Sequence, residues 1–367
     1  MKKVGLMGGS FDPVHIGHIS VVSEAFRQFD LDEFYFIPTG INPWKDKTVA
    51  SNEQRIKMLE LAIENIDTNK KIKIYKYEIN HANQKNYTYK TLEHLTHKHK
   101  KTQYYYFMGC DQMNNFHLWK KASQISTMVQ LVYFDRGGYK YKRDNIKKYH
   151  FLKLTHQKIK ASSTAIRKGN LSLLNDNVLD YIGETGLYLN TMIRPRMKEK
   201  RYKHSLSVAK YAREFAIGNG LDANKAYIAG VLHDVAKEMP HNKALKLMKQ
   251  YYPNYVDKPE AIWHQWLSSY VARTEFHVYD EEILKAIEDH TTASTEISKL
   301  GMCLYCADKL DPLRGYDSSK DIEICRYDIE LGFQRQLDSF YFFSKSKGRK
   351  IDECFFEVYK KFGKGEL

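Results

Sequence analysis

A glycine-rich segment reading GGSFDPVHIGH, residues 8–18, carries two histidines three residues apart, His15 and His18. It follows a short apolar run and precedes a stretch whose apolar positions recur at helical spacing. A strand, a glycine-rich turn and a helix start form an anion site, because free backbone N–H groups and the helix dipole point at one spot. Gly8 and Gly9 let the backbone approach a phosphate, and both imidazoles can face the same anion. The segment predicts phosphate chemistry, although the letters HIGH alone are equally typical of two packed or solvated histidines.

A second set of residues that could do chemistry lies in the C-terminal half, on apolar helical patterns: His204, His233, Asp234, His264, His290 and Asp308. A single inward histidine is usually a satisfied core residue. Six inward polar groups are costly to bury separately, because each would need its own hydrogen-bond partner. A metal centre satisfies them together, and the mixed imidazole and carboxylate set suits iron or manganese better than a closed zinc site.

Further polar motifs follow the predicted strands of the first half. They are Asn42-Pro43-Trp44-Lys45, Tyr87-Thr88, Gly109-Cys110-Asp111 with Trp119 soon after it, and Ser162-Ser163-Thr164 with Arg167. Taken singly, each is also typical of a loop, a helix cap or a core residue. At the carboxyl ends of parallel strands they would offer cations, hydroxyls and helix N–H groups to a nucleotide and its polyphosphate.

Elements of two kinds must position these residues. Strands are predicted at residues 3–7, 33–38, 72–79, 104–108, 129–134 and 151–154, and they alternate with helices at 19–29, 53–66, 88–99 and 163–168. This alternation predicts a parallel sheet covered by helices on both faces. Residues 190–200 are polar and basic and contain Pro195, which is typical of a linker.

Beyond the predicted linker only helical periodicity remains. Helices are predicted at residues 204–216, 224–237, 242–251, 260–273, 281–290 and 300–310. The second half is therefore predicted to be an all-α domain. The chain divides into a first domain over residues 1–190 and a second over residues 191–367.

The motifs of the first half, in this order, resemble those of the nicotinate-nucleotide adenylyltransferases, which belong to the HxGH nucleotidyltransferases. The resemblance covers about residues 1–190. It departs from the family at Asn42-Pro43-Trp44-Lys45, where the family has P-P-H-[KR], and at Ala161. It implies a Rossmann-like α/β fold and the transfer of AMP from ATP, which brings Mg²⁺, to nicotinate mononucleotide.

The same resemblance implies roles for individual residues. The ATP-binding residues would be Gly8, Gly9, Ser10, Phe11, His15, His18, Gly109, Asp111, Ser162, Ser163, Thr164 and Arg167, of which His15, His18 and Arg167 would be catalytic. The residues that bind the mononucleotide would be Lys45, Tyr87, Thr88, Trp119 and Arg136.

The order His…His-Asp…Asp in the second half resembles the HD-domain phosphohydrolases. The strings at residues 201–205, 232–237, 263–264, 290–292 and 307–312 are similar to the bacterial HD family of symmetrical diadenosine-tetraphosphate hydrolases. This resemblance covers about residues 196–345. It implies two divalent metals, iron or manganese, and cleavage of a dinucleoside polyphosphate into two ADP.

The ligand set is also implied by this resemblance. One metal would be held by His204, His233, Asp234 and Asp308, and a second by His264 and His290, with Asp234 essential for catalysis. Lys237 would meet a substrate phosphate. Cys303 and Cys306 lack a second cysteine pair and are interpreted as core residues.

Composition limits the other classes of function. The net charge of +14 comes mainly from lysine-rich stretches, which we interpret as a solvated surface that attracts ATP and similar polyanions rather than nucleic acid. No apolar run approaches the roughly 18 residues of a membrane span, and the start lacks a signal region. Five scattered cysteines favour a reducing cytoplasm. A homo-oligomer is compatible with the sequence.

Three alternatives remain open at this point. The first half is compatible with another HxGH transferase that uses nicotinamide mononucleotide or phosphopantetheine as the acceptor. The second half is compatible with an HD nucleotidase or phosphodiesterase of different substrate. The basic surface is compatible with an RNA-binding protein that keeps one degenerate site.

Overall fold

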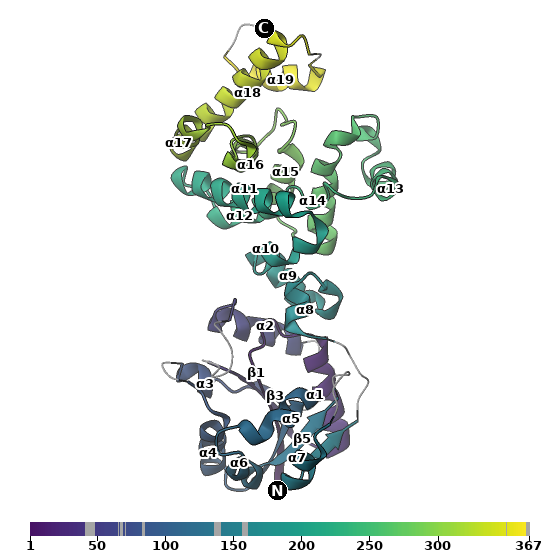
Figure 1. Ribbon diagram of the computed structural model, residues 1–367, viewed down its shortest axis with the longest axis vertical. Coiled ribbons are helices and arrows are strands. Elements are labelled where there is room, and N and C mark those ends of the chain that lie inside the picture. Colours follow the sequence, from purple (N-terminus) through teal and green to yellow (C-terminus); the bar gives the residue numbers. More distant parts are fainter. Residues whose placement is uncertain are drawn as a thin grey trace. The chain divides into compact units, whose positions relative to one another are not determined.

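The computed structural model describes residues 1–40, 48–64, 66, 69, 71–82, 85–135, 141–155, 161–349 and 351–364 (Figure 1). Contacts divide the chain into two compact units. Unit 1 comprises Met1–Ile166 and Asn170–Val178, and unit 2 comprises Arg167–Gly169 and Leu179–Leu367.

Unit 1 is built on a six-stranded parallel sheet of order β3-β2-β1-β4-β5-β6. The strands are β1 (Lys2–Gly9), β2 (Glu33–Pro38), β3 (Lys71–Ile74), β4 (Thr102–Gly109), β5 (Gln130–Phe134) and β6 (Leu152–Leu154). The chain order reverses between β1 and β4, which pair with each other. Ligands of such sheets bind outside the carboxyl ends of the strands at this point. The predicted parallel α/β fold is confirmed.

Helices connect these strands. They are α1 (Ile16–Phe29), α2 (Asn52–Glu64), α3 (Tyr77–Asn80), α4 (Thr88–Lys98), α5 (Cys110–Asn115), α6 (Ala122–Met128), α7 (Arg143–Lys148) and α8 (Ser163–Arg167). Side chains on both faces of the sheet are buried: Phe34 and Phe36 are fully buried, and the alternate residues Tyr35 and Ile37 belong to a core cluster that includes Leu92 of α4. Burial on both faces is expected for a parallel sheet.

One predicted strand is too long. The sequence pattern predicts an extended segment over residues 72–79, but β3 ends at Ile74 and Tyr77–Asn80 forms the short helix α3. The backbone N–H of Tyr75 still bonds to the carbonyl of Phe36 at 2.7 Å, and Asn80 already bonds back to Lys76 at 3.0 Å. The alternation of apolar residues continues past the end of the strand, so the pattern could not mark where pairing stops.

Unit 2 is helical, and its described residues contain no strand. Its helices include α10 (Leu189–Met192), α11 (Glu199–Gly218), α12 (Ala223–Leu232), α13 (His241–Tyr251), α14 (His264–Glu275), α15 (Glu281–Asp289), α16 (Lys299–Lys309), α17 (Ser319–Tyr327), α18 (Ile329–Ser346) and α19 (Glu353–Phe362). The helix α9 (Asp176–Thr185) spans the division between the units. The Asp222 side chain caps α12, which ends just before the His233-Asp234 pair rather than at residue 237 as predicted.

Residues 190–200 are not the linker that their composition predicts. This stretch contains the end of α10, a 3-10 turn at Arg194–Arg196 and the start of α11. Met192 and Ile193 are fully buried and Met197 is 6% exposed. The apolar residues anchor a basic segment to unit 2, and the division by contacts falls earlier, after Val178. None of the described helices is long and apolar enough to cross a membrane.

Candidate functional site

Two charged, buried side chains hold the turn between β1 and α1. The carboxylate of Asp12 accepts hydrogen bonds from the backbone N–H groups of Val49 and Ala50, each at 3.0 Å. The guanidinium of Arg55, fully buried in α2, donates to the carbonyl of Ser10 at 2.7 Å. No sequence pattern indicates Arg55, because its role depends on the packing of α2 against the turn. These contacts tie the glycine-rich turn to residues 49–55, at the start of α2.

The two histidines of this turn stack on each other at the start of α1. Their ring centroids are 3.7 Å apart at an interplanar angle of 24°, and His15 and His18 are 5% and 8% exposed. The backbone N–H of His15 donates to Nδ1 of His18 at 3.3 Å. A Cβ at Gly17 would lie 3.1 Å from Nδ1 of His15 and 3.0 Å from Cβ of Ala161. The glycine between the histidines therefore makes room for the His15 ring.

The predicted serine motif adjoins this turn. The hydroxyl of Ser162 accepts a hydrogen bond from the backbone N–H of Ala165 at 3.1 Å and so caps α8. The hydroxyl of Ser163 donates to the carbonyl of Pro13 at 2.8 Å. Thr164 is exposed. Two predicted ATP-binding segments, distant in the sequence, are thus brought together.

Tyr106 of β4 links the predicted ATP and mononucleotide residues. A Cβ at Gly8 would lie 2.4 Å from the Tyr106 hydroxyl, and this hydroxyl bonds to Thr88 at the start of α4. The ring of Trp119 packs edge-on against the Tyr106 ring with centroids 6.2 Å apart. Tyr87 precedes α4 in extended backbone. Gly8 lies next to the last residue of β1, at the edge of the sheet where ligands of such folds bind.

The structure describes only some of the other predicted site residues of unit 1. Gly109 ends β4, and Asp111 is half-buried in the first turn of α5. Lys45 and Arg136 lie outside the described residues. Arg167 ends α8 but groups with unit 2, so its contact with phosphates stays a prediction.

In unit 2, possible metal ligands form two groups that share Asp234. One group is His204, His233 and Asp234, and the other is Asp234, His264 and His290. Within each group the ligand atoms lie within 4.8 Å of one another. Nε2 of His204 also lies 3.0 Å from Oδ1 of Asp308. The structure therefore brings together all six residues that the sequence singled out.

Backbone carbonyls orient two of these histidines in the same way. Nδ1 of His233 donates to the carbonyl of Gly230 at 2.7 Å, and Nδ1 of His290 donates to the carbonyl of Ile287 at 2.6 Å. Each bond fixes the ring so that Nε2 is left to face the cluster. Burial lowers the pKa of His264 to about 2 and that of His290 to about 4. Both imidazoles are therefore neutral, as a metal ligand must be.

The cluster contains a buried atom that suits a metal. Nε2 of His233 is buried and has no hydrogen-bond partner among the described residues. It lies 3.4 Å from Oδ2 of Asp234 and 4.0 Å from Oδ1 of Asp308. An orphaned buried nitrogen is costly, and one divalent cation would satisfy it together with both carboxylates. The donor set fits the metal centre that the sequence predicts.

Asp311 is a functional residue that the sequence reasoning missed. It is fully buried, and its Oδ2 accepts a hydrogen bond from Nδ1 of His204 at 2.5 Å. Burial alone lowers the pKa of His204, but its hydrogen bonds to Asp308 and Asp311 raise this pKa to about 9. Unlike His264 and His290, this ring would therefore release a proton when it binds a metal. Asp311 lies beyond the end of α16, at the cap of the turn Pro312–Arg314, so the helical pattern that placed Asp308 could not indicate this role. Asp311 orients His204 for a metal.

We expect Asp311→Ala to weaken metal binding about 10- to 100-fold, because outer carboxylates that orient a histidine ligand typically contribute that much. The measurement is a competition titration with a metal chelator on the full chain. Asp317→Ala, at an exposed aspartate nearby, is the matched control and should bind metal normally. Equal affinity of the Asp311 variant and the wild type would rule out this role.

Four cations surround the cluster: Arg201, Lys237, Lys309 and Arg314. Nη1 of Arg201 lies 2.5 Å from Oδ2 of Asp234, and Nη2 of Arg314 lies 2.6 Å from Oδ1 of Asp308. The side chains of Arg201, Lys309 and Arg314 are 33%, 32% and 40% exposed, whereas the ligands are buried. Burial alone raises the pKa of Asp308, but the neighbouring cations and His204 hold it well below its usual range. We call these four residues the cationic rim. Of the four, the sequence predicts a contact with a substrate phosphate only for Lys237.

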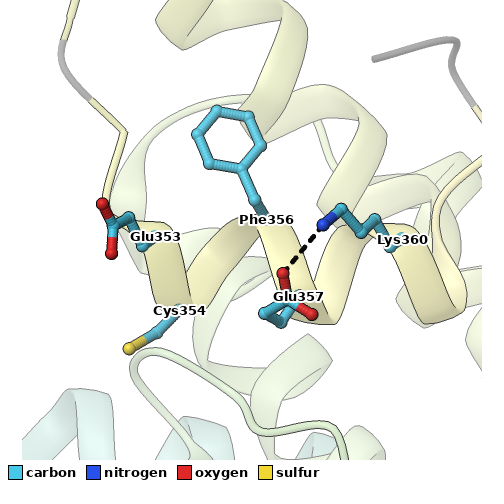
Figure 2. A pocket seen from close by; sticks show the side chains of 5 residues that line it. All are labelled: Glu353, Cys354, Phe356, Glu357 and Lys360. Carbon is cyan, nitrogen blue, oxygen red and sulfur yellow. Dashed lines mark hydrogen bonds and ion pairs between the residues drawn. The ribbon is translucent and has the colours of Figure 1, made fainter.

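A hollow of about 590 Å³ lies on α19 at the end of the chain, and its lining is drawn in Figure 2. It is lined by Glu353, Cys354, Phe356, Glu357 and Lys360. Glu357 and Lys360 pair with each other at 2.9 Å. None of the predicted site residues contributes to this hollow, so it is separate from the metal cluster.

Comparison with known proteins divides the chain into two parts, and each part contains one of the two sites described above. Residues 6–169 match the cytidylyltransferase-like family, and residues 201–313 match the HD domain family. The first match contains the histidine turn, and the second contains all six clustered histidines and aspartates.

Three curated relatives extend this result. Proteins called "Probable nicotinate-nucleotide adenylyltransferase/Ap4A hydrolase" from Mycoplasma genitalium and Mycoplasma pneumoniae are 29% and 26% identical. The matches cover 88% and 90% of this chain, and 91% and 97% of those proteins. A "Probable nicotinate-nucleotide adenylyltransferase" from Halalkalibacterium halodurans is 34% identical over 51% of this chain and 92% of that protein.

Proposed function

Because the chain belongs to the nicotinate-nucleotide adenylyltransferase family, we propose that unit 1 transfers AMP from ATP to nicotinate mononucleotide and releases pyrophosphate. The observation that carries this proposal is the stacked pair of His15 and His18 beside the glycine-rich turn. Both rings and the turn's backbone N–H groups can meet one phosphate. This gives the site the means to stabilise the charge that develops on the α-phosphate.

The reaction needs no covalent intermediate. The 5′-phosphate of the mononucleotide attacks the α-phosphorus of ATP in line, and pyrophosphate leaves with its electrons. The site must align two anions and neutralise charge. In this proposal His15 and His18 hold the α-phosphate, and Arg167 with Ser162–Thr164 holds the departing phosphates. Magnesium arrives with ATP and supplies further neutralisation.

In this proposal the residues around Tyr106 bind the acceptor, nicotinate mononucleotide. Trp119 stacks on the pyridine ring, and the backbone at Tyr87 and Thr88 donates to the pyridine carboxylate. Asp111 orients a ribose hydroxyl. Lys45 and Arg136 meet the acceptor phosphate in this proposal.

Pyrophosphate release from ATP with different acceptors tests this proposal. Nicotinate mononucleotide should support release, and nicotinamide mononucleotide and phosphopantetheine should support it much less. A preference for either of the latter two would keep the transfer chemistry and overturn the acceptor. No release with any acceptor would overturn the function of unit 1.

Gly17→Ala is expected to lower the rate of adenylyl transfer about tenfold or more, since small displacements of a positioning group cost up to about 100-fold. The new Cβ would contact the His15 ring and Ala161, so the imidazole must move. The measurement is kcat for dinucleotide formation at saturating substrates. Hydrolysis by unit 2 of the same preparation is the internal control, and an unchanged kcat for transfer would show that the ring position does not matter.

We further propose that unit 2 hydrolyses diadenosine tetraphosphate to two ADP with two divalent metals, iron or manganese. The observation that carries this proposal is the pair of ligand groups that share Asp234. When bound, two such metals would supply an activated water and would neutralise charge on both sides of the phosphorus under attack. His204, His233, Asp234 and Asp308 hold one metal, and His264 and His290 hold the other.

The cationic rim supports a substrate with several phosphates. Arg201 and Arg314 each present a planar guanidinium, which binds phosphate through two parallel hydrogen bonds. With metals bound at Asp234 and Asp308, Arg201 and Arg314 would be available to bind the phosphates. A monophosphate ester offers too few anionic oxygens for four cations, so a polyphosphate chain fits better than the substrate of a simple nucleotidase.

Metal content tests this part of the proposal. The full chain, stripped and reloaded with ferrous iron or manganese, should hold two metals and hydrolyse the tetraphosphate faster than AMP or an aryl phosphate. One metal per chain would overturn the two-metal assignment. We place the reaction in the cytoplasm, a setting with which five cysteines outside any disulfide agree.

A further inference from the structure

A buried carboxyl group lies beneath the acceptor half of unit 1 and has no assigned function. Glu78, in α3, is 6% exposed. Its Oε1 accepts a hydrogen bond from the hydroxyl of Thr91 at 2.8 Å, and Thr91 is 1% exposed. Its second partner is the hydroxyl of Thr39, just beyond β2. One side chain therefore ties together three segments: α3, α4 and the exit of β2.

Burial also changes the acidity of this carboxyl group. Burial raises the pKa of Glu78 to about 7, although both threonine hydrogen bonds oppose the rise. The hydroxyl-bearing ring of Tyr106 is its titratable neighbour on β4, and burial also raises the pKa of Tyr106. An amide of the same shape could replace a protonated carboxyl, whereas removal would leave buried hydroxyls without a partner.

Thr91 connects this network to the acceptor site. It follows Thr88 by three residues on α4, so the two lie on the same face of the helix one turn apart. The backbone of α3 is also close to the exit of β2: a Cβ at Gly40 would lie 2.4 Å from the carbonyl of Glu78 and 2.6 Å from Oδ1 of Asn86. Asn86 directly precedes Tyr87. The side chain of Glu78 therefore braces α4 through Thr91, and its backbone packs against the exit of β2, next to Asn86.

We infer that Glu78 is a positioning residue that sets acceptor specificity: through Thr91 it fixes the start of α4 so that the Tyr87–Thr88 backbone donates to the carboxylate of nicotinate mononucleotide. The inference rests on the function proposed for unit 1. Backbone N–H donors favour a carboxylate, and they favour an amide less because its NH₂ group cannot accept. Such discrimination requires donors held in place, since a site built around hydrogen bonds rejects a substrate that lacks the matching group.

The test compares Glu78→Ala with Glu78→Gln in the full chain. Loss of a buried hydrogen-bond network in Glu78→Ala should raise KM for nicotinate mononucleotide about tenfold. It should also lower the preference for nicotinate over nicotinamide mononucleotide, with KM for ATP nearly unchanged. Glu78→Gln keeps the shape and hydrogen-bonding capacity and should restore most of both. Glu64→Ala, at an exposed glutamate that ends α2, is the matched control.

Thr91→Val removes the same bond from the other side and serves if Glu78→Ala does not fold. A folded variant of either kind with the wild-type acceptor preference would overturn the inference, even if its thermal stability fell. The function proposed for unit 1 fails differently, because wild-type protein would then form no dinucleotide from nicotinate mononucleotide. A shift in acceptor preference is a result that a merely structural role would not produce.

Discussion

Asp234→Ala is expected to abolish metal-dependent hydrolysis and leave adenylyl transfer unchanged. Asp234 belongs to both ligand groups, so its loss removes a ligand from each metal. It also leaves Arg201 without the carboxylate that it now contacts at 2.5 Å. We expect a loss of more than about 100-fold, since even outer partners of metal ligands typically cost 10- to 100-fold. The measurement is hydrolysis of diadenosine tetraphosphate and metal content in one preparation.

Asp222→Ala is the matched control for this change. Asp222 caps α12, the helix that leads into His233 and Asp234, and its side chain accepts hydrogen bonds from Asn224 and Lys225. Its loss should cost about 1 kcal/mol of stability and leave the metal in place. If the folded Asp234 variant lost both activities, the two sites would not be independent.

His15→Ala is expected to lower kcat for adenylyl transfer by about 10²- to 10³-fold, the typical cost of losing one donor to developing charge. His18→Ala should have a similar effect, because the rings are stacked and serve the same phosphate. The losses should not add in the double variant, since the pair acts as a unit. Dinucleotide formation at saturating ATP is the measurement.

His81→Ala changes an exposed histidine of unit 1 and provides the control for this series. Hydrolysis by unit 2 should be unaffected in every member. Near-normal transfer by His15→Ala would contradict the proposed mechanism, because no other described imidazole stacks on His18.

The fold was predictable where pattern and packing agree. The strand at Glu33–Pro38 has the predicted bounds, because an apolar run between polar neighbours must be buried. The error at residues 72–79 arose because Tyr75, Tyr77 and Ile79 alternate like a strand while the chain turns into α3. The error at residues 190–200 arose because basic composition hides buried residues such as Met192 and Ile193.

The candidate sites, like the fold, were predictable only in part. The clustered histidines and aspartates could be found because six polar groups on apolar faces demand a common explanation. Arg55, Asp311 and Glu78 could not, because each acts on a residue from another part of the fold. Arg314 is one of many basic residues in the sequence, and only its contact with Asp308 distinguishes it. Sequence patterns identified residues that would touch a ligand, and the structure was needed for those that hold them.

The most direct test of the account is the set of products that the full chain, loaded with ferrous iron or manganese, forms from diadenosine tetraphosphate. Anion-exchange separation distinguishes the outcomes. We expect two ADP per substrate, with no such product from Asp234→Ala. ATP plus AMP would keep the metal cluster and contradict the assigned bond. Full metal content without turnover would contradict the substrate proposed for unit 2.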